Sequence, residues 1–152
     1  MLSLNLPSYT PKVSQKNGKN LIFDPIRRKH VALTPEEWVR QHFVNYLISE
    51  KEYPAGLIAN EVAISVNSLS KRCDTVVYNC FLEPLVVVEY KAPSVPITQN
   101  VFEQIARYNI SLRVQFLIVS NGLQHYCCEI DYINQTYTYL EEIPFYSSLV
   151  QK

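Results

Sequence analysis

Several features that would place a protein in a membrane, secreted or zinc-binding class are missing from this chain of 152 residues. No stretch approaches the roughly 18 consecutive apolar residues of a membrane span. The polar N-terminal segment lacks the apolar core of a secretory signal. The four cysteines form no CxxC pair and have no nearby histidine at zinc-ligand spacing. We therefore expect a cytoplasmic protein with free, buried thiols and no membrane partner.

The chain also lacks an excess of charge of either sign, because 14 basic and 14 acidic side chains cancel. The distribution is uneven, since residues 1–30 carry six basic side chains and one acidic side chain, whereas residues 31–152 carry eight and thirteen. The polar, basic start of the chain fits either a phosphate-seeking tail or a solvated leader. We expect residues 1–23 to form a mobile basic arm, and the segment LIFDP (21–25) could add a short strand before the first helix.

The clearest local signal is the start of a helix. Thr34 is a good N-cap, Pro35 suits the first helical position, and Glu37 completes the capping box T-x-x-E. Apolar residues then recur at helical spacing to about Ser49.

Strands and a second helix follow in a regular order. The strand at 85–91, LVVVEYK, is a β-branched run typical of a strand that is buried on both faces. The whole pattern predicts one α/β domain with the order αβββαβ and a hairpin return, with residues 131–152 as a C-terminal extension that adds an edge strand. The expected strands are 57–66, 72–81, 85–91, 114–120 and 123–130, and the expected second helix is 101–112.

Three charged residues interrupt these apolar strands. Glu89 and Lys91 are two apart and therefore point to one face, and an antiparallel neighbour would place Asp74 beside Glu89. Two carboxylates so close repel one another, and a divalent cation with a preference for hard oxygen ligands, Mg²⁺ or Mn²⁺, relieves that repulsion. Lys91 could then orient or help deprotonate an attacking water. Metal-assisted phosphodiester hydrolysis is the chemistry that these side chains fit.

The second helix adds two polar residues on one side. Gln104 and Tyr108 are four positions apart and so face the same direction. The pattern D74-x14-E89-Y-K91 followed by Q104-I-A-R-Y108 resembles the PD-(D/E)xK nuclease superfamily, with the Q-x-x-x-Y extension of its RecB-like branch. The surrounding segments, from T34-P-E-E-W-V-R-Q41 to S120-N-G122, resemble the N-terminal nuclease domain of type I restriction enzyme R subunits.

The resemblance implies a restriction-endonuclease-like fold over residues 24–130, a central mixed sheet flanked by helices, and Mg²⁺-dependent cleavage of DNA. It implies Asp74, Glu89 and Lys91 as catalytic residues, with Gln104 beside them. A glutamate on the first helix often completes the metal shell in such nucleases. We prefer Glu36 as that ligand, because it shares a helical face with the apolar residues, and regard Glu37 mainly as the cap.

The residues that we expect to contact DNA are Tyr108, Lys71, Arg72 and Arg40, although Arg40 could instead pair with Glu36. Cys73 stands where the superfamily pattern has proline. No G-x-x-x-x-G-K-[ST] phosphate loop occurs, so we do not expect ATP-driven translocation from this polypeptide.

Three functions remain open at this point. The first is a metal-dependent DNA endonuclease domain for restriction, working alone, as a homodimer or with separate restriction or helicase subunits. The second is a repair or recombination nuclease with the same chemistry. The third is a non-catalytic nucleic-acid-binding or assembly module on the same fold. For the three charged residues, a buried ion-paired network without metal is the structural alternative.

Overall fold

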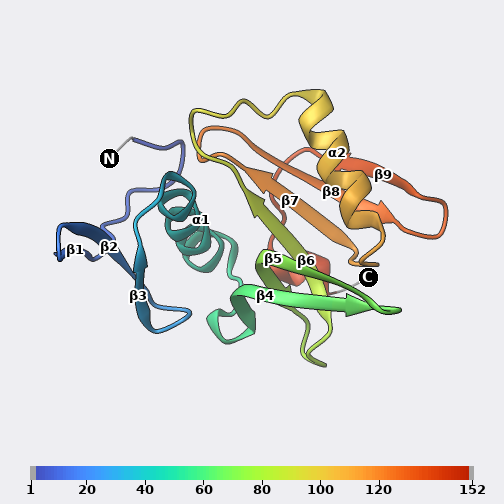
Figure 1. Cartoon of the computed structure of the whole chain (residues 1–152). Helices are drawn as coiled ribbons and strands as arrows, with labels where there is room; N and C mark the ends of the chain where they lie inside the picture. The colour runs from blue at the N-terminus through green and yellow to red at the C-terminus, as the bar shows by residue number, and fades with distance from the viewer. Residues whose placement is uncertain (1–2, 151–152) are drawn as a thin grey trace.

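The computed structural model describes residues 3–150, which form two sheets and a few helices (Figure 1). The small sheet is antiparallel, with the order β1-β2-β3, and the large sheet is mixed, with the order β4-β5-β6-β7-β8-β9. The elements are β1 (Val13–Lys16), β2 (Lys19–Asp24), β3 (Lys29–Ala32), α1 (Pro35–Lys51), the 3-10 turn η1 (Ala55–Leu57), β4 (Ile58–Val66), β5 (Leu69–Tyr78), β6 (Pro84–Tyr90), α2 (Gln99–Ile110), β7 (Phe116–Ser120), β8 (His125–Asp131), β9 (Thr136–Leu140) and α3 (Tyr146–Leu149).

The predicted order αβββαβ is confirmed by α1, β4, β5, β6, α2 and β7. β6 and β7 are parallel neighbours joined through α2, whereas the other neighbours in the large sheet are antiparallel. A parallel pair needs a long crossover, and α2 supplies it. β9 lies at the edge of the sheet next to β8, where an edge strand was predicted.

Two apolar clusters cover the opposite faces of the large sheet. The α1 cluster includes Phe43 and Val88, and the α2 cluster includes Ile105 and Val87. Val87 and Val88 are consecutive in β6 and therefore point to opposite faces. The β-branched run of β6 is thus buried on both sides, as its sequence predicts. This central position holds the end of β6, with Glu89 and Lys91, in a defined place.

The prediction of a mobile arm over residues 1–23 is wrong for residues 13–23, which form β1 and most of β2. Asn17 and Gly18 join these strands, both at positive φ (53° and 76°), as a two-residue hairpin turn requires. This Asn-Gly signal was present in the sequence. Ile22 is fully buried, which anchors the small sheet to the rest of the molecule.

No helix within residues 3–150 is long and apolar enough to cross a membrane.

The helix signals at the start of α1 are confirmed in part. The Thr34 hydroxyl accepts a hydrogen bond from the Glu37 N–H at 3.0 Å, and Pro35 begins the helix. The carboxylate of Glu37, however, bonds to other side chains, so its predicted role as the return arm of a capping box is wrong.

Candidate functional site

Asp74 and Glu89 lie opposite one another at the end of the β5–β6 ladder. The last regular pair is Thr75 with Val88, and Asp74 and Glu89 are the next residues outward on the two strands. The Tyr90 N–H donates a hydrogen bond to Asp74 Oδ2 at 2.9 Å, which ties the carboxylate to the neighbouring strand. The juxtaposition that the sequence predicts for these two carboxylates is therefore present.

The carboxylate of Asp74 is half-buried and has no ion-pair partner among the described residues. Burial raises the pKa of Asp74 above its usual value, and the negative charges of Glu89 and Glu61 add to this shift. The Tyr90 N–H and the positive charge of Arg40 oppose the shift without cancelling it. Within residues 3–150 no cationic side chain forms an ion pair with this carboxylate. Arg40 Nη1 instead donates to the backbone carbonyl of Asp74 at 2.7 Å. A partly desolvated carboxylate that lacks an ion-pair partner becomes more favourable when further positive charge approaches it.

Glu89 has a partner that the sequence did not suggest. Lys71 Nζ lies 2.8 Å from Glu89 Oε1 and 3.2 Å from Asn109 Oδ1, and it sits 3.9 Å from the centre of the Tyr108 ring. Lys71 was expected to contact DNA, but in this arrangement its ammonium is the counter-ion of Glu89. Asn109 is a site neighbour that sequence reasoning missed, because nothing marks it within the helix.

Lys91 follows the end of β6 and stays free of ion pairs among residues 3–150. Its backbone N–H donates to the Ser120 carbonyl at 2.9 Å, which fixes the main chain at this point between β6 and β7. The side chain is half-buried. An ion pair at Glu89 is therefore present, as in the structural alternative, but Lys71 and not Lys91 forms it.

Gln104 and Tyr108 are both exposed on α2, and Tyr108 has 61% of its surface open to solvent. Their common direction is as the helical spacing predicts. Tyr108 adjoins the site through Lys71. The buried face of α2 is formed by other residues, namely Phe102, Ile105, Ala106 and Asn109.

A small cavity of about 250 Å³ opens beside Asp74. It is lined by Thr34, Glu36, Glu37, Arg40, Glu61, Asp74 and Tyr90. Glu36 therefore reaches the predicted neighbourhood, but it is exposed at the first turn of α1, whereas Glu37 is 5% exposed. Helical spacing gives the direction of a side chain and not its depth. The role of Glu36 as a metal ligand stays a prediction.

The buried carboxylate of Glu37 belongs to an ion network. Arg40 donates two hydrogen bonds to it, from Nε at 3.1 Å and from Nη2 at 2.6 Å, and Arg27 Nη2 donates a third at 2.8 Å. Burial raises the pKa of Glu37, but hydrogen bonds from Arg40, Arg27 and Gln41 together hold it below its usual value. Glu37 thus remains charged because its neighbours compensate it.

Arg40 connects this network to the site. Its Nη1 lies 2.9 Å from Glu61 Oε1, in addition to its bonds with Glu37 and the Asp74 carbonyl. The predicted pairing of Arg40 with Glu36 is wrong. A DNA contact by Arg40 stays a prediction, although its guanidinium is buried and already shared among these oxygens. Arg72 is exposed, and its Nε lies 3.2 Å from Glu61 Oε2.

The network begins in the small sheet, at a residue that the sequence analysis missed. Asp24 is fully buried and pairs with Arg27, and Asn60 Nδ2 donates to it at 3.0 Å. Asp24 Oδ1 also accepts from the Ile26 N–H at 2.8 Å, an Asx turn that the Asp-Pro dipeptide could have suggested. Asp24 links β2 to β4 and so joins the two sheets.

Replacing Arg40 by methionine is expected to lower the free energy of unfolding by about 3–5 kcal/mol, since it leaves the buried Glu37 without its main partner. Urea unfolding measures the change. The control is the double variant Arg40→Met with Glu37→Gln, which removes both charges and should recover a large part of the loss. If the double variant were no more stable than Arg40→Met, the charge of Glu37 would not be the cause.

No group of three or more His, Cys, Asp or Glu side chains within residues 3–150 is arranged to hold a metal ion. Asp74 and Glu89 face one another, and Glu36 lines the same cavity as Asp74. The protein could therefore offer a divalent ion the two carboxylates of Asp74 and Glu89. Hard cations such as Mg²⁺ commonly take one or two carboxylates and complete their shell with water and substrate phosphate, so the residues fit such an ion.

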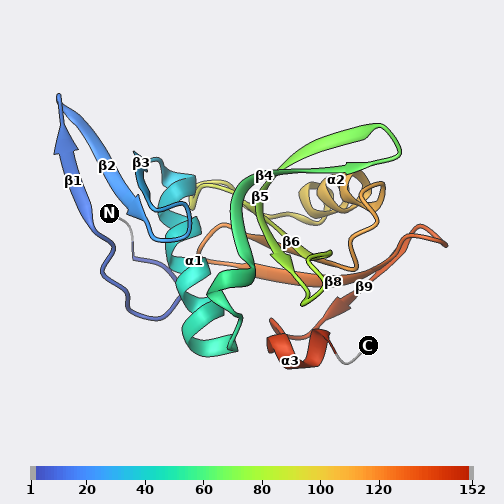
Figure 2. The ribbon, with the colours of Figure 1, turned by 90° about the horizontal axis from the view of Figure 1, so that it is seen from below.

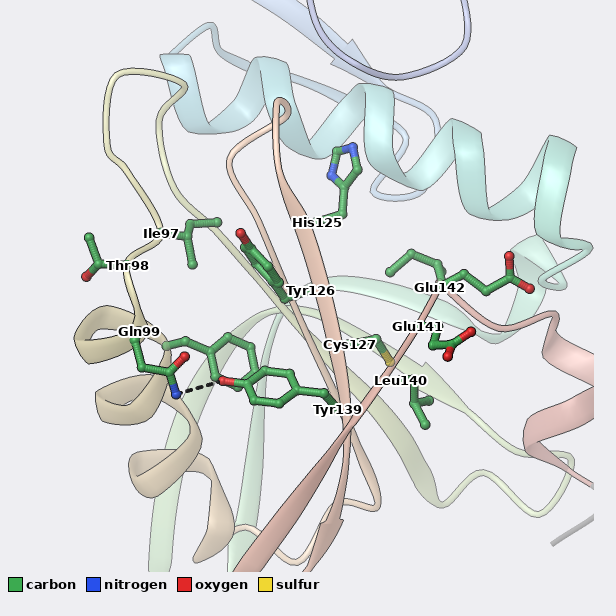
Figure 3. Close-up of a pocket in the computed structure, with 12 residues that line it drawn as sticks. Ile97, Thr98, Gln99, His125, Tyr126, Cys127, Tyr139, Leu140, Glu141 and Glu142 are labelled. Carbon is green, nitrogen blue, oxygen red and sulfur yellow. Dashed lines mark hydrogen bonds between the residues drawn. The ribbon is translucent and has the colours of Figure 1, made fainter.

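A second cavity, of about 460 Å³, lies between α2 and the β8–β9 pair and contains none of the three predicted catalytic residues (Figure 3). Tyr139 and Gln99 meet at its wall, where Gln99 Nε2 donates to the Tyr139 hydroxyl at 3.3 Å. Glu141 and Glu142 add negative charge there. This cavity offers no cluster of groups for hydrolysis.

Comparison with known families and structures identifies the chain. Residues 35–144 match the family model described as the N terminus of the type I restriction enzyme R protein. The chain belongs to this family. The matched region contains the whole β5–β6 site and α2. The resemblance to the N-terminal domain of type I restriction enzyme R subunits is therefore confirmed, and the domain is a restriction-related one.

A solved structure supports the fold. The chain is similar to a fragment of an HsdR subunit of a type I restriction enzyme from Vibrio vulnificus YJ016, with a TM-score of 0.54 and 20% sequence identity. The match covers 78% of this chain and 25% of that chain, so this R-protein N-terminal domain corresponds to about a quarter of the HsdR fragment. The predicted restriction-endonuclease-like fold is confirmed. No curated protein sequence matches the chain.

Proposed function

We propose that this domain is a metal-dependent DNA endonuclease domain of a restriction system, which hydrolyses phosphodiester bonds. The observation that carries the proposal is the carboxylate of Asp74. It is half-buried, its pKa is raised, it faces Glu89, and no cationic side chain within residues 3–150 forms an ion pair with it. Positive charge from a divalent ion and from Lys91 would compensate it.

Asp74 and Glu89 would hold the ion, and Glu36 at the cavity mouth is a third candidate. When bound, Mg²⁺ (or Mn²⁺ as a substitute) supplies Lewis-acid chemistry toward a phosphoryl oxygen and an attacking water. The free ammonium of Lys91 follows Glu89 by two residues and is available to stabilise the charge that develops on the phosphate. Gln104 and Tyr108 present polar atoms on α2 toward a DNA strand.

DNA is the proposed substrate, and the matched relative is named as a subunit of a type I restriction enzyme. We propose that the domain works with separate restriction or helicase subunits. A repair or recombination nuclease would use the same residues on branched DNA, so the choice of substrate separates these roles. A non-catalytic assembly module would respond to neither metal nor substrate.

The test combines melting with cleavage. Millimolar Mg²⁺ or Mn²⁺ should raise the melting temperature of the wild-type protein, because a ligand that binds only the folded state stabilises it by mass action. The same ions should support cleavage in a panel of linear, nicked, branched and single-stranded DNA. Glu50→Gln, which removes an exposed carboxylate at the far end of α1, is the control and should behave as the wild type. Unchanged melting together with no cleavage of any substrate would leave the assembly module as the function.

A further inference from the structure

Lys71 is a lysine whose ammonium is taken out of solvent. Its side chain is 10% exposed, and its three near partners come from two elements: Glu89 from β6, and Asn109 and Tyr108 from α2. The β4–β5 hairpin, which carries Lys71, extends beside α2 and so brings this lysine to the α2 residues (Figure 2). A long, flexible lysine side chain is normally hydrated, so this placement needs specific compensation.

The two α2 partners are neutral, and Asn109 is held in place independently of Glu89. Asn109 is 2% exposed, and its Nδ2 donates to the Ile105 carbonyl at 2.7 Å. That bond leaves Oδ1 as the atom that faces Lys71. The Tyr108 ring offers its face to the same ammonium. We refer to Asn109 and Tyr108 as the α2 cradle, which can keep the ammonium of Lys71 whether or not Glu89 also contacts it.

The Lys71 ammonium and a divalent ion would therefore compete for the carboxylate of Glu89. A divalent ion held by Asp74 and Glu89 would lie within a few ångströms of the Lys71 ammonium, and like charges at that distance in a partly buried site repel strongly. One carboxylate cannot compensate both at their closest approach. Asp74 has no such competitor among the described residues, so the competition falls on Glu89 alone.

We propose that Lys71 is the resident counter-ion of Glu89 and that a divalent cation replaces it there, while the α2 cradle retains the displaced ammonium. The inference rests on the proposed function, because it assigns Glu89 to the ion. In the metal-free protein Lys71 compensates part of the charge of Glu89. In the metal-bound protein the same ammonium remains beside the site, as an additional positive charge for a DNA phosphate.

A purely structural Lys71–Glu89 pair makes the opposite forecast. If Lys71 must stay on Glu89 for the carboxylate to be correctly placed, its removal should weaken metal binding or leave it unchanged. If Lys71 competes with the ion, its removal should tighten metal binding. The sign of the change in metal affinity therefore decides between the two.

The experiment measures the dissociation constant for Mn²⁺ alone, by calorimetry, for the full chain and for Lys71→Gln. We expect Lys71→Gln to bind Mn²⁺ on the order of tenfold more tightly, because one repelling charge is gone. Its melting temperature without metal should be lower than that of the wild type, and the rise on adding Mn²⁺ should be larger. Arg72→Gln is the matched control, since it removes one positive charge at the next position, where the side chain is exposed and pairs with Glu61. Lys71→Arg keeps the charge and should not gain affinity.

A second measurement needs no variant and so does not depend on the folding of Lys71→Gln. The acylation rate of the Lys71 amine in the wild-type protein, read by peptide mass spectrometry, should rise several-fold when Mn²⁺ is added. Loss of Glu89 as a partner removes the shortest of the three contacts that shield the amine from the reagent. Exposed Lys12 serves as the internal reference and should not change.

The outcomes separate the inference from the function on which it rests. Tighter Mn²⁺ binding by Lys71→Gln with a wild-type-like Arg72→Gln supports the exchange, and so does metal binding that appears only in Lys71→Gln. If the wild type binds Mn²⁺ and Lys71→Gln binds it equally or more weakly, the exchange is overturned and the proposed function still stands. The same holds if the wild type binds Mn²⁺ but the acylation rate of Lys71 does not change. If neither the wild type nor Lys71→Gln binds Mn²⁺, the exchange and the proposed function are both overturned.

Discussion

Replacement of Asp74 by asparagine is expected to reduce cleavage by a factor on the order of 10³ or more and, without metal, to raise the melting temperature. The first effect follows because a neutral amide is a poor ligand for a hard divalent ion, and the Lewis-acid contribution of such an ion amounts to several kcal/mol. The second follows because burial and the nearby Glu89 raise the pKa of Asp74 in the folded protein, so its charge opposes folding at neutral pH. Asparagine keeps an oxygen that can accept from the Tyr90 N–H.

The stabilisation of the metal-free protein by Asp74→Asn should depend on pH. A carboxyl whose folded pKa is raised costs no stability while both states are protonated, and the cost grows as pH rises from its unfolded pKa, about 4, through its folded pKa. The stability gained by Asp74→Asn should therefore be absent at low pH, increase through this window and then level off. Urea unfolding of the two proteins across pH measures it.

The matched control is Glu37→Gln, which neutralises a buried carboxylate on the other wall of the same cavity. Hydrogen bonds from Arg40, Arg27 and Gln41 lower the pKa of Glu37 in spite of its burial, so its charge stabilises the fold above its unfolded pKa, and that contribution is lost as pH falls through the folded value. Glu37→Gln should thus lose stability at neutral pH, where Asp74→Asn gains it. A destabilised Asp74→Asn would mean that Asp74 is a structural residue.

The fold could be predicted from the sequence because its signals are local. The N-cap Thr34 and the β-branched run of β6 depend on neighbours in the chain, and both are found where the pattern placed them. The strand order of the site followed from the same logic, since Asp74 and Glu89 fall opposite each other once β5 and β6 pair. Of the small N-terminal sheet, only a short strand at residues 21–25 was expected, because residues 1–20 are polar and their Asn-Gly turn was overlooked.

The partners of the site residues could not be predicted in the same way, because they depend on distant segments. Lys71 reaches Glu89 and Asn109 across 18 and 38 positions of the chain. Arg40 meets the Asp74 carbonyl across 34 positions. Sequence spacing specifies which face a side chain occupies, whereas its ion partner depends on how the faces are packed. This is why Lys71, Arg40 and Glu37 were each assigned the wrong neighbours or none.

Lys91→Ala is expected to lower the turnover of cleavage by a factor on the order of 10² to 10³ and to leave metal binding in place, as the loss of one preorganised charge beside the reacting phosphate does in other enzymes. Lys91 forms no ion pair within residues 3–150, so its removal leaves no buried carboxylate without a partner. The free energy of unfolding should therefore change by less than about 1 kcal/mol. Metal affinity should stay the same or increase slightly, because a positive charge near the two carboxylates is gone.

Three measurements on this one variant test the role of Lys91: single-turnover cleavage, Mn²⁺ affinity and urea unfolding. Arg107→Ala, which removes an exposed positive charge from α2, is the control for general loss of attraction to DNA. Such a loss would raise the DNA concentration needed for half-maximal cleavage and leave the rate at saturation intact, whereas Lys91→Ala should lower the rate at saturation. An unfolded Lys91→Ala protein without a metal response would contradict the nuclease assignment, because it would make Lys91 a structural charge in a site that binds no ion.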